Sequence, residues 1–210
     1  MFTAGLGNSG LLAFLPIWAG GLGSASGQAA AILFGSAYAG ALVSQWPAGH
    51  LSDQLDRRIV IAALAGAAGF AALLLAVLLN PGLVGGAILI GLWGAASLAY
   101  YAIAIAHAAD RSRVEELPAI ASGLLMVWAA GSVIGPLLFG LVSSGPLGAR
   151  GLFLLAALFS FALAAAMLWR RRTRAPVSAE EREPFVNLQA TSAELADIDT
   201  SPAEWGDDIR

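Results

Sequence analysis

The sequence has no cysteine, no lysine and few charged residues of any kind. Without cysteine there is no disulfide and no thiolate metal site, and two histidines alone do not make a standard zinc site. We therefore expect no metal and no cofactor. Only 12% of the 210 residues are charged and 58% are hydrophobic, whereas a soluble domain is about one quarter charged. This composition indicates a membrane protein and gives no reason to expect a nucleic-acid partner.

The few charges are gathered in short clusters that leave long charge-free runs. No residue is charged from 1 to 52 or from 59 to 109. A span needs about 20 apolar residues to cross roughly 30 Å of hydrocarbon, so each run holds two helices, and Leu117 to Trp169 holds two more. We expect an all-helical membrane domain over residues 1–174. Its six predicted spans are 2–19, 28–50, 59–79, 83–109, 118–142 and 151–169.

The arginines are unevenly distributed between the two ends of the predicted spans. They follow the second, fourth and sixth spans, and only Arg150 lies at the opposite end. The positive-inside rule then predicts a multi-pass protein of the plasma or inner membrane with both termini in the cytoplasm. Residues 175–210 hold nine acidic residues and two arginines. Such a composition predicts a disordered cytoplasmic tail, with a docking segment as the alternative.

Gly49 to Arg58, GHLSDQLDRR, form a charged decapeptide between the second and third predicted spans. Gly49 has no side chain, so a neighbouring helix can approach closely. Asp53 is placed to meet a helix N-terminus, and the arginines can meet carboxylates or lipid phosphates. A contact of this kind made in only one conformation would bias an equilibrium by about 1–3 kcal/mol. The alternative is that Arg57 and Arg58 only determine topology.

This decapeptide resembles the loop signature of the major facilitator superfamily, G-x-L-a-D-r-x-G-r-k. The matching residues are Gly49, Leu51, Ser52, Asp53, Arg57 and Arg58. Gln54 and Asp56 depart from the signature. The fifth predicted span resembles a glycine and proline signature of some facilitators, which implies close helix packing and a kink. The residues that carry this second resemblance are Gly131, Gly135, Pro136 and Gly140.

The resemblance implies that the chain is one half of a transporter. Facilitators have twelve helices in two six-helix halves, each half built from inverted three-helix repeats, with the substrate held between the halves. The fourth span lacks the buried arginine often found in the first half, which favours the C-terminal half. The second half would belong to the same longer chain, to a split gene product or to a second copy. Because the family's loop docks on the opposite half, we expect Asp53 to lack its partner within this chain.

The fourth predicted span is the best candidate for lining a substrate pathway. Its polar and aromatic residues recur at spacings of three and four and form one stripe on a continuous helix, and the equivalent helix of the family lines the cavity. Interfacial aromatic belts are the alternative. The candidate pathway residues are Asn8, Tyr38, Gln45, Trp93, Ser97, Tyr100, Tyr101 and Trp128. His107 either caps its helix or is a proton-sensitive site, and no carboxylate lies in any predicted span.

Two other classes of function compete with transport. Gly7 to Gly10 match the GxSG motif of rhomboid-type intramembrane serine proteases, but the serine lies in the first span and the last span has no histidine to activate it. The other alternative is a non-transporting membrane subunit or a fragment. We expect no enzyme, but secondary transport of a small solute such as a drug, a sugar or a small organic ion.

Overall fold

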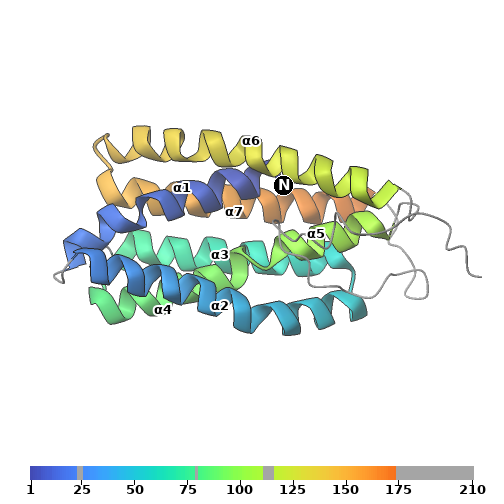
Figure 1. Cartoon of the computed structure of the whole chain (residues 1–210), viewed down its shortest axis with the longest axis horizontal. Coiled ribbons are helices and arrows are strands. Elements are labelled where there is room, and N and C mark those ends of the chain that lie inside the picture. The colour runs from blue at the N-terminus through green and yellow to red at the C-terminus, as the bar shows by residue number, and fades with distance from the viewer. Residues whose placement is uncertain (23–25, 79, 111–115, 174–210) are drawn as a thin grey trace, which may run out of the picture.

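The computed structural model describes residues 1–22, 26–78, 80–110 and 116–173, and it is all-helical over these ranges (Figure 1). Six helical spans are long and apolar enough to cross a membrane, which confirms the predicted fold class. The predicted acidic tail, 175–210, lies outside the described residues. The elements are α1 (Phe2–Ala19), the short 3₁₀ helix η1 (Gly20–Leu22), α2 (Ser26–Gln54), α3 (Arg57–Leu78), α4 (Gly82–Ser97), α5 (Tyr100–Ala109), α6 (Leu117–Ser143) and α7 (Gly148–Thr173).

The spans pair in a pattern that repeats between the first three and the last three. α1 packs along α6, α2 packs along α4, and α3 packs against α7. The pairing is symmetric when the first, second and third spans are exchanged with the fourth (α4 and α5), the fifth (α6) and the sixth (α7). The α1–α6 pair then becomes the α4–α2 pair. The α3–α7 pair maps onto itself. This symmetry is the one expected of two three-helix repeats.

Glycines of α6 allow its backbone to touch that of α1. A Cβ atom added at Gly131 would clash with the Phe2 carbonyl oxygen, and one added at Gly135 would clash with the Leu6 carbonyl oxygen. The order of these contacts shows that the two helices run parallel and that α1 begins level with the middle of α6. Four residues singled out in the sequence lie in the stretch of α6 that runs alongside α1: Gly131, Gly135, Pro136 and Gly140.

Glycines also allow the backbones of α2 and α4 to touch. A Cβ atom at Gly40 would clash with the Gly91 carbonyl oxygen, and one at Gly94 would clash with the Ala37 carbonyl oxygen. Small residues matter at such crossings because lipid offers no hydrophobic driving force between helices, so close van der Waals packing must hold them together. The two glycine crossings therefore occupy equivalent places in the two repeats.

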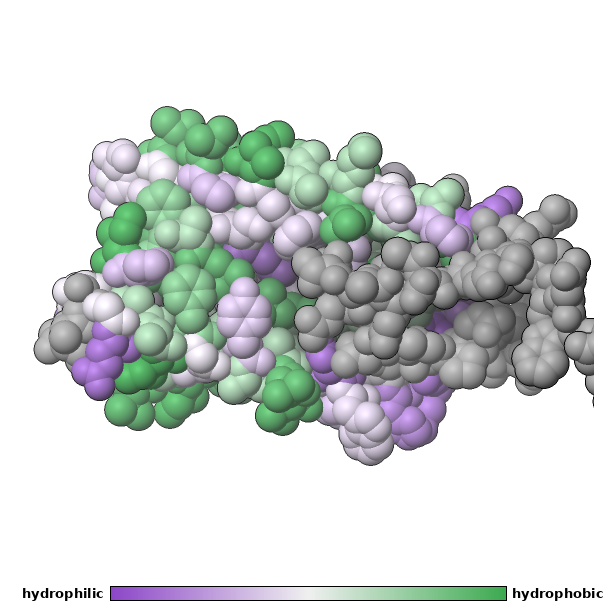
Figure 2. Space-filling model, in the orientation of Figure 1, coloured by the Kyte–Doolittle hydropathy of each residue, from purple (hydrophilic) through white to green (hydrophobic). Residues whose placement is uncertain are grey.

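The buried fraction differs strongly between the spans. Only 22% and 17% of the most apolar stretches of α2 and α6 are buried, against 44% to 61% in the other spans. Large apolar side chains such as Val43 and Trp46 on α2 and Val133 on α6 are exposed, and apolar residues cover much of the visible face (Figure 2). Such a surface is suited to contact with lipid or with another membrane protein.

The charged decapeptide is mostly helical rather than a loop. α2 extends to Gln54 and α3 begins at Arg57, so only Leu55 and Asp56 form the turn. Asp56 makes this short turn feasible because its Oδ1 accepts a hydrogen bond of 3.0 Å from the Arg58 backbone N–H, as an N-cap residue does. The helix ends therefore hold the charged side chains in defined positions.

Candidate functional site

Arg57, in the first turn of α3, is the centre of a buried charged cluster. Its Nε lies 3.0 Å from Oδ2 of Asp110, the residue that caps the C-terminus of α5. Its Nη2 lies 3.3 Å from Oδ1 of Asp53, near the end of α2. The side chains of Arg57 and Asp110 are only 1% and 2% exposed. One guanidinium thus joins the ends of three helices.

Burial makes the two contacts of Arg57 unequal. Removing one partner of a buried ion pair leaves an uncompensated charge, which costs about 3–5 kcal/mol. The Asp53 side chain is 35% exposed, and solvent screening limits such a pair to about 1 kcal/mol or less. The pair with Asp110 is therefore the dominant contact.

Other residues of the decapeptide extend the cluster to α7. Arg58 is buried and donates a hydrogen bond of 3.1 Å from Nη1 to the Arg170 carbonyl oxygen. Ser52 is fully buried and donates a hydrogen bond of 2.7 Å to the Gly49 carbonyl oxygen. Leu51 is exposed on the outer side of α2. The decapeptide therefore connects α2, α3, α5 and α7.

That Asp53 lacks its partner from the opposite half stays a prediction, but Asp53 does have a charged partner within this chain, Arg57. The two-residue turn places Asp53 and Arg57 four residues apart, within reach of each other. Asp110, the other partner of Arg57, was not predicted from the sequence. Its sequence position did indicate that it lies near the decapeptide. Asp110 is the first charged residue after the run 59–109, and it ends its span on the same side as the decapeptide.

His107 belongs to the surroundings of this charged cluster. It lies in the last turn of α5, and Arg58, Asp56 and Arg170 are close enough to act on it electrostatically. It is only partly buried. Whether it caps the helix or responds to protons stays a prediction.

A second, neutral polar centre lies where the fourth span is interrupted. α4 ends at Ser97 and α5 begins at Tyr100. Asn8 of α1 donates a hydrogen bond of 3.1 Å from Nδ2 to the Ser97 carbonyl oxygen, and the Tyr100 hydroxyl donates one of 3.2 Å to Asn8 Oδ1. A side chain inserted into the helical ladder is a known cause of a kink, and in lipid each freed backbone group needs such a partner.

The predicted polar stripe falls into two groups that do not follow the interruption. Trp93, Ser97 and Tyr100 are at most 3% exposed and face the interior of the bundle. Tyr101 instead meets Trp128 of α6 edge to face, with ring centroids 6.2 Å apart. The stripe is therefore shared between the interior of the bundle, where Trp93, Ser97 and Tyr100 lie, and the contact of Tyr101 with α6.

The remaining pathway candidates lie on α2. The Tyr38 side chain is 56% exposed, in contrast to the buried Asn8, and Gln45 is partly buried. The structure therefore brings Asn8, Ser97 and Tyr100 together and leaves Tyr38 on the outer surface. Assignment of any of these residues to a substrate pathway stays a prediction.

A known family can account for three features together: six paired spans, a charged turn between the second and third, and an interrupted fourth span. The family model described as Major Facilitator Superfamily matches residues 1–205. The chain belongs to the major facilitator superfamily. No curated protein and no solved structure matches the chain.

Membership of the major facilitator superfamily determines the broad class of function. The superfamily consists of multi-pass secondary transporters and not of enzymes, so the resemblance seen in the decapeptide is confirmed and the protease hypothesis is excluded. Ser9, the serine of the GxSG motif, is an ordinary residue within α1. The membrane-length helices imply a lipid bilayer as their surroundings.

Proposed function

We propose that the chain forms one six-helix half of a secondary transporter that moves a small solute across the cell membrane by alternating access. Family membership supports transport, and the pairing symmetry of the six spans supports one half built from two repeats. The absence of arginine from the fourth span favours the C-terminal half. The arginine distribution favours a cytoplasmic location for both termini in the plasma or inner membrane.

The observation that carries the mechanism is the buried pair of Arg57 and Asp110. Arg57 belongs to the first repeat and Asp110 to the second, so the pair joins the two repeats at one end of the bundle. Alternating access moves one half of the transporter against the other around the substrate, and we propose that the two repeats of this half shift at this end during that motion. A pair that closes in one conformation and opens in the other would act as a latch and bias the two states by about 1–3 kcal/mol.

The neutral centre supplies the second part of the mechanism. At the interruption the Ser97 carbonyl oxygen accepts a hydrogen bond from Asn8, and the buried Ser97 hydroxyl makes no hydrogen bond with the described part of the chain. Interrupted helices of this kind hold substrates or ions in other transporters. A small organic solute with an apolar body and one or two hydrogen-bonding groups suits such surroundings.

The second half would cover the spans that this chain leaves most open. α2 and α6 have the least buried apolar stretches, so they offer surface to another membrane domain. That domain would come from the same longer chain, from a split gene product or from a second copy. The alternative, a non-transporting subunit, would use the same surface for a partner of a different kind.

The test uses the transporter assembled from both halves in detergent. A thermal-shift screen against metabolites and drugs should find a ligand that raises the unfolding temperature, and proteoliposomes should transport that ligand only when both halves are present. A chain that is monomeric in the membrane, with no second half encoded beside it or fused to it, would contradict the proposal and favour the non-transporting subunit.

Membrane orientation has its own test because introduced cysteines would be the only thiols in the chain. Ser144→Cys lies between α6 and α7, and Thr173→Cys lies at the end of α7; both positions are exposed. An impermeant maleimide added to intact cells should label Ser144→Cys and leave Thr173→Cys unlabelled. The reverse pattern would overturn the proposed orientation.

A further inference from the structure

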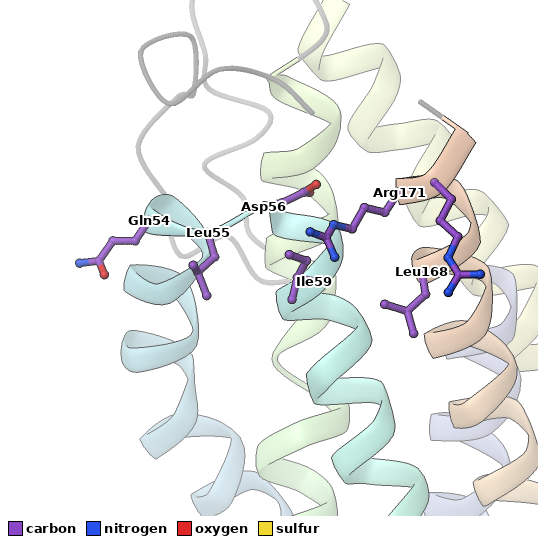
Figure 3. A pocket seen from close by; sticks show the side chains of 7 residues that line it. Gln54, Leu55, Asp56, Ile59, Leu168 and Arg171 are labelled. Carbon is purple, nitrogen blue, oxygen red and sulfur yellow. The ribbon is translucent and has the colours of Figure 1, made fainter. Parts of the chain in front are cut away.

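A pocket of about 670 Å³ opens beside the latch, between the α2–α3 turn and the last turns of α7 (Figure 3). Neither Arg57 nor Asp110 lines it, so it is distinct from the latch. Its lining residues are Gln54, Leu55, Asp56, Ile59, Leu168, Arg171 and Arg172.

Hydrogen bonds hold the two walls of the pocket in place. The Arg58 guanidinium donates to the Arg170 carbonyl oxygen, which fastens the end of α7 to the start of α3. The Asp56 carboxylate accepts the Arg58 backbone N–H, and its other oxygen is buried. Asp56 itself lines the pocket, so its negative charge offsets part of the positive charge of Arg171 and Arg172, and the lining keeps a net positive charge.

The pocket combines these charges with an apolar floor. Arg171 and Arg172 are exposed in the last turn of α7, whereas Ile59 and Leu168 are apolar residues of the membrane-length helices. Cations above apolar side chains at the end of a span lie where the hydrocarbon of a bilayer gives way to its headgroups. A soluble anion would use only the arginines, but a lipid would use both parts of the lining.

We propose that this pocket binds an anionic glycerophospholipid of the surrounding leaflet. Its phosphate would accept hydrogen bonds from Arg171 and Arg172, since guanidinium groups match phosphate oxygens in geometry and charge. Its acyl chain would lie over Ile59 and Leu168. With two arginines and one carboxylate in the lining, the pocket favours a lipid with a net negative charge over a zwitterionic one. This inference does not depend on the identity of the transported solute.

The chain offers a matched control for the charge of this region. Arg170 is exposed, adjacent in sequence and on the same helix end, but it does not line the pocket. If the arginines act only by making the electrostatic potential at the membrane surface more positive, loss of Arg170 and loss of Arg171 should lower the lipid affinity equally. If the pocket is a binding site, only the loss of Arg171 should matter.

Native mass spectrometry of the full chain in detergent, titrated with phosphatidylglycerol or phosphatidylcholine of the same acyl chains, tests the proposal. We expect phosphatidylglycerol to bind about tenfold more tightly, and Arg171→Gln to weaken that binding about tenfold, as loss of one hydrogen bond to a charged group does. Arg170→Gln should change the dissociation constant less than about twofold, and Arg171→Lys should have an intermediate affinity because it keeps the charge but loses the guanidinium geometry. Thermal unfolding in lipid-free detergent should be the same for all three variants.

Four outcomes would overturn the proposal. These are equal affinity for the two lipids, equal losses in Arg170→Gln and Arg171→Gln, displacement of the lipid by soluble glycerol phosphate at similar concentration, and binding that appears only after acidic residues of the chain are neutralised. The last result, tested with Glu180, Glu181 and Glu183 changed together to Gln, would show that the chain's own acidic segment is the occupant.

Discussion

The two buried polar centres both join the first repeat to the second, but they differ in charge and in depth. The charged one, Arg57 with Asp110, lies where helices end, whereas the neutral one, Asn8 with Ser97 and Tyr100, lies where a span is interrupted. An ionised side chain at the centre of a bilayer costs about 2.5–3.5 kcal/mol even by the lowest estimates. Charges are therefore placed at the bundle end, where they form a strong contact, and the weaker neutral bonds are used within the span.

Loss of one charge from the charged centre should lower the free energy of unfolding the most. We expect Asp110→Asn to lower the free energy of unfolding by about 3–5 kcal/mol, because Arg57 then remains buried without its main counter-charge. The double variant Arg57→Met with Asp110→Leu should recover most of that loss, since apolar side chains need no counter-charge. Chemical unfolding in detergent measures both.

Asp53→Asn is the matched control, because it removes the same kind of charge from the more exposed partner of Arg57. We expect it to cost about 1 kcal/mol or less. Equal losses in Asp53→Asn and Asp110→Asn would show that burial does not distinguish the two contacts.

An intermediate effect is expected at the neutral centre. Asn8→Leu keeps the side-chain volume similar but removes both hydrogen bonds, and hydrogen bonds between membrane helices are worth about 0.6 kcal/mol each on average. We expect a loss of about 1 kcal/mol in the free energy of unfolding, and roughly half of that for Tyr100→Phe. A loss in Asn8→Leu that exceeds the loss in Asp110→Asn would reverse the comparison.

The smallest effect on stability is expected at Tyr38, which lies outside both centres. Tyr38→Phe removes one hydroxyl from an exposed ring, so the free energy of unfolding should change by less than about 0.5 kcal/mol. If Tyr38 contacts the solute, the affinity for the ligand found by thermal shift should fall by a few-fold, about the value of one neutral hydrogen bond. Unchanged affinity would remove Tyr38 from the pathway.

The spans were predictable from the sequence because lipid imposes a simple rule on composition. The charge-free runs on either side of the decapeptide each hold two helices, and the glycines at Gly131 and Gly135 indicated close packing before their partner was known. Partners that are distant in sequence were not predictable in the same way. Nothing local to Ser97 shows that its carbonyl group is taken by Asn8, 89 residues away, so the break in the fourth span could not be foreseen.

The same limit applies to the charged cluster. The spacing of Asp53 and Arg57 belongs to one short segment, but the dominant partner, Asp110, is brought in by the packing of α5 near α3. Trp93 illustrates a further limit, because its helical spacing cannot tell a pathway residue from a core residue, and it is 1% exposed in the core.

The proposed mechanism requires the contact between Arg57 and Asp110 to open during transport. Ser52 is fully buried and directly precedes Asp53, which pairs with Arg57, so we expect Ser52→Cys, as the only thiol of the chain, to react with a maleimide only when the latch opens. In the assembled transporter, the ligand found by thermal shift should change the labelling rate of Ser52→Cys by about 5- to 150-fold, the range of typical conformational coupling. Labelling of the exposed Gln54→Cys should not change. A labelling rate of Ser52→Cys that is the same with and without bound ligand would contradict the account.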